Sequence, residues 1–279
     1  MQVVGFGPYL GDFKEELLTF RPYIRWLMEI LDYDDFYIKS HFNRYFLYKN
    51  YVDSEHYIDV YKNLSRDELH QKSIIHKQIN QKDFLEMTKS FKKHILEEKK
   101  CSKKNITLYY LNYIKNISTY SIYQKIFDRI EDPEDVDLDI EGEYIVFVPD
   151  QIMNKTLIEN LYNKLVKEFG DKIKVCGDFK THLTNENIVL HEPDYFENGY
   201  KYNIKYMNNA KAVICPCGHW TALANLQQIP VFSWGHNPGQ YKGGIYSFDN
   251  PKNNIISGDR KSSVEILYKQ FNHFLEKLK

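Results

Sequence analysis

The sequence contains little cysteine and no long apolar run, and both shortages restrict the class of protein. Four cysteines in 279 residues are too few for a disulfide scaffold. The pair Cys215 and Cys217 lacks the second cysteine pair or histidine cluster that a zinc site needs. No stretch approaches the roughly 18 apolar residues of a membrane span, and the first residues lack the pattern of a signal peptide. We therefore expect a cytoplasmic protein that has no membrane span.

Small residues are scarce as well, and they cluster in two regions. No glycine occurs between Gly11 and Gly142, and all four alanines lie within residues 210–224. Glycines gather at residues 5–11 and again at residues 218–244. Glycine and alanine allow a backbone to approach a ligand, or a helix to lie close to a sheet. We interpret the two clusters as ligand-binding loops, with tight packing as the alternative.

Charge is balanced over the whole chain, with a net charge of −1, but it is distributed unevenly. Residues 62–125 hold fourteen basic and six acidic side chains, whereas residues 128–143 hold one basic and nine acidic side chains. Aromatic residues such as Phe84, Phe91 and Tyr109 are interleaved with the lysines of the first segment. This pattern can hold a nucleic acid through phosphate contacts and base stacking. A solvated helix surface, neutralised by the acidic segment, is the alternative.

Hydrophobic periodicity predicts strands that alternate with helices along the chain. The predicted strands span residues 2–6, 36–38, 105–111, 144–148, 173–176, 188–190, 212–215 and 231–234. The predicted helices span residues 12–31, 41–52, 82–100, 114–130, 154–169, 199–209, 218–228 and 262–278, and Pro22 should kink or split the first of them.

Strands that alternate with helices imply parallel sheets with right-handed crossovers. We therefore predict an α/β fold of two Rossmann-like halves, each a parallel sheet flanked by helices, with a cleft between them. The acidic residues 131–143 are the expected linker. The predicted domains are residues 1–135 and 136–279.

The strongest sequence signal for a ligand site is the segment 211–235, in which a strand runs into Cys217 and Gly218 before a helix. The N-terminus of a helix presents backbone N–H groups and a positive dipole end, which suit a phosphate. Gly218 permits close approach, and His219 and Thr221 can add side-chain donors. An ordinary strand–turn–helix, with His219 as a capping residue, is the alternative.

Weaker candidates follow the other strands of the second half. Gly177, Asp178 and Glu192 lie after predicted strand ends, where they would contact a nucleotide or simply turn the chain. The glycine-rich loop at residues 239–244 would close over phosphates, with Lys242 as the counter-charge. No carboxylate pair at a strand end indicates a metal site, so we expect no metal.

In the first half, the glycine-rich turn at residues 5–11 leads to Asp12 at a predicted helix start. Asp12 would either cap that helix or act as a base that accepts a hydroxyl proton. The turn is not a dinucleotide-binding fingerprint. Arg21 and Arg25 on the following helix would face either the cleft or solvent.

Two segments resemble glycosyltransferases of the GT-B architecture, in particular the heptosyltransferase-like group. YLGDFKEELLTFRPYI is similar to the Gly-Asp turn that opens the first helix in that group, and CPCGHWTALANLQQIPVFSWG is similar to its turn–helix and following strand. The longer segment GFGPYLGDFKEELLTFRPYIRW also resembles glycosyltransferases of large bacteriophages. Together these segments cover about fifty residues of the chain.

The resemblance implies a donor domain in the second half and an acceptor domain in the first. Asp12 would deprotonate the acceptor hydroxyl. Cys217, Gly218, His219 and Thr221 would hold the donor diphosphate, and His219 would also stabilise it as it leaves. The co-substrate would be a nucleotide-diphosphate sugar, without a metal or another cofactor.

The acceptor loop implied by this assignment contains Gly7, Tyr9, Gly11, Arg21 and Arg25. The acceptor is then either a hydroxylated base of phage DNA, in the host cytoplasm, or a surface glycan or lipid-linked sugar. A non-catalytic module that binds nucleotides or nucleic acid is the alternative from another class. The sequence leaves the sugar, the nucleotide base and the oligomeric state open.

Overall fold

A computed structural model shows the chain as two compact units, Met1–Phe127 (unit 1) and Asp128–Lys279 (unit 2). The residues that the structure describes are 1–10, 16–42, 44–60, 81–110, 128–134, 136, 142–149, 155–177, 183, 199–257 and 263–279.

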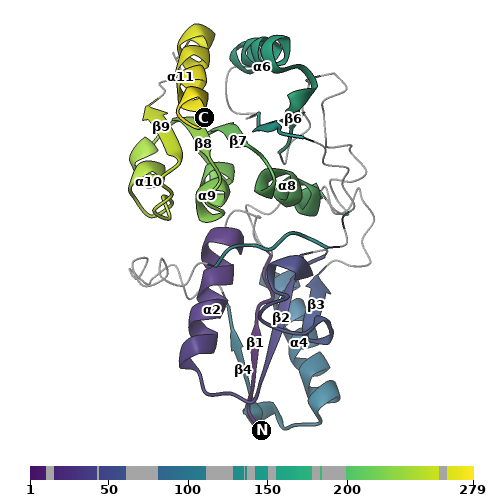
Figure 1. The fold of residues 1–279 in the computed structure, drawn as a ribbon. Helices are drawn as coiled ribbons and strands as arrows, with labels where there is room; N and C mark the ends of the chain where they lie inside the picture. The colour runs from purple at the N-terminus through teal and green to yellow at the C-terminus, as the bar shows by residue number, and fades with distance from the viewer. Residues whose placement is uncertain are drawn as a thin grey trace. The chain divides into compact units, whose positions relative to one another are not determined.

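Unit 1 is built on a parallel sheet with the strand order β3-β2-β1-β4 (Figure 1). Its strands are β1 (Val3–Phe6), β2 (Asp35–His41), β3 (Tyr57–Val60) and β4 (Ile106–Tyr109). The predicted strands at 2–6, 36–38 and 105–111 are therefore confirmed, while β3 was not predicted. The chain passes from β1 to β2 and β3 on one side and then crosses to β4 on the other, so the carboxyl ends of β1 and β4 mark the topological switch point.

The helices of unit 1 include two α-helices, α2 (Arg21–Ile30) and α4 (Gln81–Lys99). A π-helix, η1 (Glu16–Phe20), precedes α2, which confirms that the first predicted helix is divided near Pro22. The remaining short helices are of the 3-10 type: η2 (Tyr45–Leu47), η3 (Ser54–His56) and η4 (Lys103–Asn105). The predicted helix at 114–130 lies largely outside the described residues.

The predicted helix at residues 41–52 is wrong. His41 is the last residue of β2 and pairs with Val60 of β3, and Phe42 N donates to Val60 O at 3.1 Å. The sheet therefore takes the start of the segment, and only the 3-10 turn η2 follows. The aromatic residues that suggested a helical stripe, Phe46 and Tyr48, are buried from a loop instead.

Unit 2 contains a second parallel sheet with the order β6-β5-β7-β8-β9 (Figure 1). Its strands are β5 (Ile145–Phe147), β6 (Ile173–Val175), β7 (Ala212–Pro216), β8 (Val231–Gly235) and β9 (Asn253–Ser257). Its helices are α6 (Lys155–Phe169), the 3-10 helix η7 (Gly170–Lys172), α8 (Gly199–Asn208), α9 (His219–Leu226), α10 (Pro238–Lys242) and α11 (Val264–Glu276). β9 and α10 were not predicted, and the predicted strand at 188–190 lies outside the described residues.

Alternating residues of the unit 2 strands serve two faces of the sheet. Phe147, Ile214 and Trp234 share one apolar core with residues of α6 and α11. Cys215 and Ser233 point to the other face, where their side chains contact Thr221 of α9. Helices thus cover both faces of the sheet.

Small residues allow α9 to lie close to its sheet. Ala222 and Ala224 are fully buried in this helix, which contacts both β7 and β8. The packing interpretation of the alanine cluster is therefore confirmed, and the ligand-binding interpretation stays a prediction.

Residues 128–134 are attached to the helices of unit 2. Ile130 N donates to Gln227 Oε1 (3.0 Å), and Gln227 Nε2 donates back to Ile130 O (2.7 Å). Asn208 Nδ2 donates to the Asp132 carboxylate at 2.6 Å. Unit 2 therefore begins at Asp128, before the predicted boundary at 135 and 136, and the first acidic residues of the expected linker belong to it.

Both units are α/β, with parallel sheets flanked by helices, as predicted from the sequence. Among the described residues, no helix combines the length and the apolar character needed to cross a bilayer.

Candidate functional site

The carboxyl ends of β5 and β7 form the topological switch point of the unit 2 sheet. β5 pairs with β6 on one side and with β7 on the other. Val148 N, just after β5, donates to Ile214 O of β7 at 2.9 Å, so the two strand ends stay joined. Ligands of open α/β sheets bind outside the carboxyl ends of the strands at such a point. The turn from β7 into α9 lies at this edge.

This turn is fixed by backbone contacts on both sides of Gly218. Cys217 N donates to Trp234 O of β8 at 2.8 Å, and Ala222 N donates to Gly218 O at 3.1 Å, which starts α9. Gly218 is extended (φ −176°), a conformation that any residue adopts. A Cβ added to Gly218 would approach Pro216 O no closer than 3.8 Å. The missing side chain therefore keeps the space in front of the turn open.

Thr221 holds the turn from inside. Its side chain is fully buried, and its hydroxyl accepts from Gly218 N (3.3 Å) and donates to Pro216 O (3.0 Å). The same oxygen lies 3.0 Å from Ser233 Oγ. The Thr221 hydroxyl thus serves the turn itself, in place of the phosphate contact that the sequence predicted.

The start of α9 offers backbone N–H groups and one imidazole. The N–H groups of residues 219–221 have no acceptor within the helix, and the helix dipole places partial positive charge there. His219 is half-buried, and its ring lies 5.1 Å from that of Trp220. Trp220 is buried and stacks on Tyr200 of α8. These contacts give the first turn of α9 a fixed position.

Cys217 contributes a neutral thiol to the turn. Burial, with a smaller contribution from nearby Cys215, raises the pKa of Cys217 to about 12. The thiol is therefore protonated at neutral pH and does not repel an anion. It is also a poor nucleophile, since the thiolate is the reactive form.

Two further glycines lie at the same edge of the sheet, after β8 and β6. Gly235 (φ +137°) packs against Cys217, because a Cβ there would lie 3.5 Å from Cys217 Cβ. Gly177 (φ +139°) donates its N–H to Asn203 Oδ1 at 2.9 Å, and Asn203 is fully buried. The Gly177 N–H is thus used by the fold, and a nucleotide contact by this residue stays a prediction. Asp178 and Glu192 lie outside the described residues.

The predicted phosphate-closing loop at 239–244 is wrong in its secondary structure, because most of it forms α10. Buried Asn225 of α9 fastens it from below: its Nδ2 donates to Tyr241 O (3.0 Å) and to Tyr246 O (2.8 Å). Lys242 is exposed at the end of α10. Its role as a counter-charge stays a prediction.

The glycine and tyrosine of the predicted acceptor loop in unit 1 are parts of its core. Gly7 (φ +109°) follows β1, and a Cβ there would collide with Lys39 O of β2. Tyr9 is buried, stacks on Phe20 and donates its N–H to Lys39 O at 2.9 Å. Gly11 and Asp12 lie outside the described residues.

The two arginines assigned to the acceptor loop also serve structural roles. Arg21 is 2% exposed, donates from Nε to Leu47 O (2.8 Å) and lies over the Tyr51 ring. Arg25 is exposed and forms an ion pair with Glu29 one turn later. The structure therefore places Arg21 in the core and Arg25 on the surface.

Sequence reasoning missed two buried charges in unit 1. Glu16 is fully buried in η1, and Lys39 is 7% exposed in β2. Lys39 Nζ donates to Ser90 Oγ (2.8 Å) and to Met87 O (3.3 Å), and burial lowers the pKa of Lys39 to about 8. The available signal for Lys39 was a lysine inside an apolar strand, in the run FYIKS.

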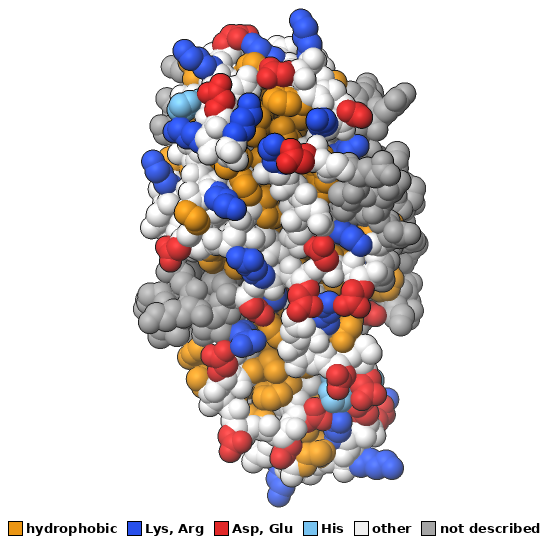
Figure 2. Space-filling model, viewed as in Figure 1, with side chains coloured by type: hydrophobic (Ala, Val, Ile, Leu, Met, Phe, Trp, Pro, Cys, Tyr) orange, Lys and Arg blue, Asp and Glu red, His pale blue; other side chains and the backbone are white. Residues whose placement is uncertain are grey.

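The basic segment 62–125 is only partly described, and its described part is largely paired or buried. Phe91 lies in the core of unit 1, so it cannot stack on a base. Lys93 pairs with Glu97, and Lys99 pairs with Asp35. On the face shown in Figure 2, the basic side chains of the described residues are interspersed with acidic ones.

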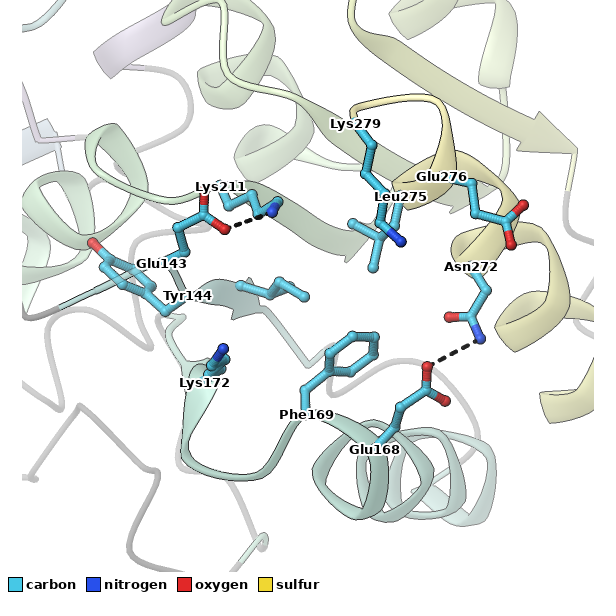
Figure 3. A pocket seen from close by; sticks show the side chains of 11 residues that line it. Glu143, Tyr144, Glu168, Phe169, Lys172, Lys211, Asn272, Leu275, Glu276 and Lys279 are labelled. Carbon is cyan, nitrogen blue, oxygen red and sulfur yellow. Dashed lines mark hydrogen bonds and ion pairs between the residues drawn. The ribbon is translucent and has the colours of Figure 1, made fainter.

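A pocket of about 270 Å³ lies at the opposite, amino edge of the unit 2 sheet. Figure 3 shows the Lys211–Glu143 ion pair and the Asn272–Glu168 contact on either side of Phe169. Its rim carries charges of both signs over an apolar floor, so it has no preference for an anion. Within the described residues, no group of three His, Cys, Asp or Glu side chains is placed to hold a metal ion.

No protein-family model matches the chain, and no curated protein matches it. Among solved structures it is similar to one described as the crystal structure of UDP-N-acetylglucosamine 2-epimerase, with 12% sequence identity and a TM-score of 0.40. The similarity covers 99% of this chain and 88% of that chain. A similarity of this size carries no argument about activity, and the fold assignment rests on the two sheet orders.

Proposed function

We propose that the protein is a glycosyltransferase that moves a sugar from a nucleotide-diphosphate donor to an acceptor hydroxyl. In this proposal the donor diphosphate binds at the turn formed by Cys217, Gly218 and His219. Asp12 of unit 1 is the base that deprotonates the acceptor. His219 and the first N–H groups of α9 stabilise the negative charge that grows on the leaving diphosphate.

The observation that carries the proposal is the position of α9 in unit 2. Its N-terminus follows β7, at the carboxyl edge of the sheet and beside the switch point between β5 and β7. Gly218 leaves the approach to that N-terminus without a side chain. An anion at this place would receive backbone N–H donors and the helix dipole together.

The test is a thermal-shift panel of the full chain with UDP, GDP, ADP and CDP. A nucleotide present at a hundredfold excess over its Kd stabilises the folded state by about 2.7 kcal/mol. For a domain of this size that corresponds to an increase in Tm of roughly 5 to 10 °C. A flat response to all four nucleotides would argue against a donor site.

Variants then assign the binding to the turn. Gly218→Ala places a methyl group in front of α9 without a steric conflict, so the ligand-free Tm should change little while nucleotide affinity falls about tenfold. His219→Gln should weaken nucleotide binding, whereas His273→Gln, at an exposed position of α11 in the same unit, is the matched control. Equal affinities for all three variants and the natural sequence would remove the turn from the proposal.

The acceptor side of the proposal is less specific. Phe91 is in the core and several lysines of α4 are ion-paired, so the described part of the basic segment gives a DNA acceptor little support. A glycan or lipid-linked sugar remains the other acceptor class. Binding of a DNA duplex that weakens steeply as salt rises would favour DNA, because phosphate contacts release counterions.

A further inference from the structure

Glu16 is a fully buried carboxylate in a part of unit 1 that the proposed mechanism depends on. It is the first residue of the π-helix η1 and follows Asp12 by four positions. Its side chain is 0% exposed. A buried carboxylate is stable only when hydrogen bonds and an opposite charge compensate it.

Three side chains supply this compensation. Glu16 Oε1 accepts hydrogen bonds from Ser40 Oγ and from Tyr48 Oη, the latter at 2.8 Å. Glu16 Oε2 accepts a charge-assisted hydrogen bond from Arg44. Both oxygens of the carboxylate are thus engaged by partners from β2 and from the segment that follows it.

The surrounding hydroxyl groups act as donors in this network. Burial raises the pKa of Tyr48 and of Tyr57 well above the usual range, and the nearby Glu16 carboxylate adds to both shifts. Both phenols therefore keep their protons. Tyr57 Oη donates to His41 O at 2.6 Å, which holds the end of β2 beside the network.

The network closes one side of the segment that carries Asp12. On its N-terminal side, Tyr9 N donates to Lys39 O at 2.9 Å. On its C-terminal side, Glu16 is bound to Ser40, the next residue of β2. Neighbouring residues of one strand therefore hold both ends of the segment 10–15. These contacts lie at the carboxyl edge of the unit 1 sheet, where a ligand of such a sheet would bind.

We propose that Glu16 is a positioning residue, which fixes the Asp12 segment to the end of β2 through Ser40, Arg44 and Tyr48. This inference rests on the proposed function for the role of Asp12, but the anchoring itself does not depend on it. A carboxylate with only a stabilising role would instead contribute to the whole of unit 1, without a specific effect on this segment.

Hydrogen exchange of the full chain, without any ligand, tests the anchoring. Tyr48→Phe removes one donor to Glu16 and leaves the Arg44 ion pair in place. Tyr45→Phe is the matched control, because the Tyr45 hydroxyl donates to Val52 O at 3.3 Å instead. We expect exchange at Tyr9 and at residues 16–20 to become about tenfold faster in Tyr48→Phe and to stay unchanged in Tyr45→Phe, since a hydrogen bond to a charged group is worth about 1.5 kcal/mol or more.

Kinetics then separate positioning from general stability. With a donor sugar nucleotide found in the panel, Tyr48→Phe should lower kcat about tenfold with the donor KM unchanged, because the donor site lies in unit 2. Glu16→Gln should lower kcat about a hundredfold, the effect of misplacing a reacting group by about 1 Å.

The outcomes of the two experiments are distinguishable. Unchanged exchange at Tyr9 and residues 16–20 in both Tyr48→Phe and Glu16→Gln would overturn the anchoring, whatever the activity of the protein. If Glu16→Gln does not fold, Tyr48→Phe alone decides. Faster exchange in a protein that neither binds nucleotides nor transfers sugar would leave the anchor in place and overturn the proposed function instead.

Discussion

Lys39 gives the most quantitative prediction, because its charge is buried without an opposite charge beside it. Among the described residues its Nζ contacts only neutral groups, namely Ser90 Oγ, Met87 O and the face of the Phe91 ring. Burial lowers the pKa of Lys39 from its ordinary value of 10.5 to about 8. The unfolded chain therefore binds a proton that the folded chain has lost at pH values between these two limits.

The sign of the effect follows from this difference. Below pH 8 both states are protonated, and the full cost of the buried charge lowers the free energy of unfolding. As pH rises through 8 toward 10.5, the folded state loses its proton first and becomes more stable relative to the unfolded state. Each pH unit in this window is worth about 1.4 kcal/mol, so the gain from pH 7 to pH 9.5 is about 2 kcal/mol.

The perturbation is Lys39→Met, which keeps the length of the side chain and removes the charge. We expect the variant to be more stable than the natural sequence at pH 7 by about 2 kcal/mol, and this advantage should almost vanish by pH 9.5. Urea denaturation at both pH values measures it. Cysteine and tyrosine titrations also affect stability at high pH, but they cancel in the difference between the two proteins.

Lys89→Met is the matched control, since Lys89 is exposed on the same helix that covers Lys39. Its stability relative to the natural sequence should not depend on pH in this range. A difference between Lys39→Met and the natural sequence that stays constant from pH 7 to pH 9.5 would refute the reasoning, because a buried charge must titrate differently in the two states.

Two further predictions concern the proposed site. Thr221→Val removes the hydroxyl that bridges Gly218 N and Pro216 O, so unit 2 should lose about 1 to 3 kcal/mol of stability and nucleotide affinity should fall with the turn; Ser263→Ala, which removes the cap of α11, should lower stability without weakening nucleotide binding. Asp12→Asn should lower the rate of sugar transfer at least a hundredfold while nucleotide binding stays unchanged; full transfer activity in this variant would remove Asp12 from the mechanism.

Long periodic elements were predictable from the sequence because their burial follows one rule over many residues. α6 and α11 present an apolar stripe at helical spacing, and that stripe packs in the core of unit 2. β5 and β7 are continuous apolar runs, as expected for parallel strands buried on both faces. The sequence of strands and helices then implied parallel sheets.

The elements that were missed lack such a pattern. β3 and β9 are short edge strands, and β9 begins with Asn253 and Asn254, which do not favour a strand. Residues 41–52 are aromatic-rich, but the pairing of His41 with Val60 decides their structure. Long-range pairing of this kind leaves no local signal.

The candidate site was predictable in its backbone and less so in its side chains. The order of strand, turn and helix located the N-terminus of α9 beside Gly218. It could not show that the Thr221 hydroxyl turns inward to Ser233, or that Arg21 is buried against Leu47, because both depend on neighbours distant in sequence. The same is true of Glu16, whose partners lie more than twenty residues away.

The most direct test of the central claim is to map the bound nucleotide by NMR, through the backbone amide shifts of the full chain titrated with UDP or the best nucleotide of the panel. The account predicts that the largest shift changes fall on residues 217–221, with the Gly218 and His219 amides foremost. Changes centred instead on Phe169, Lys172 and Lys211, around the pocket at the opposite edge of the sheet, would contradict it.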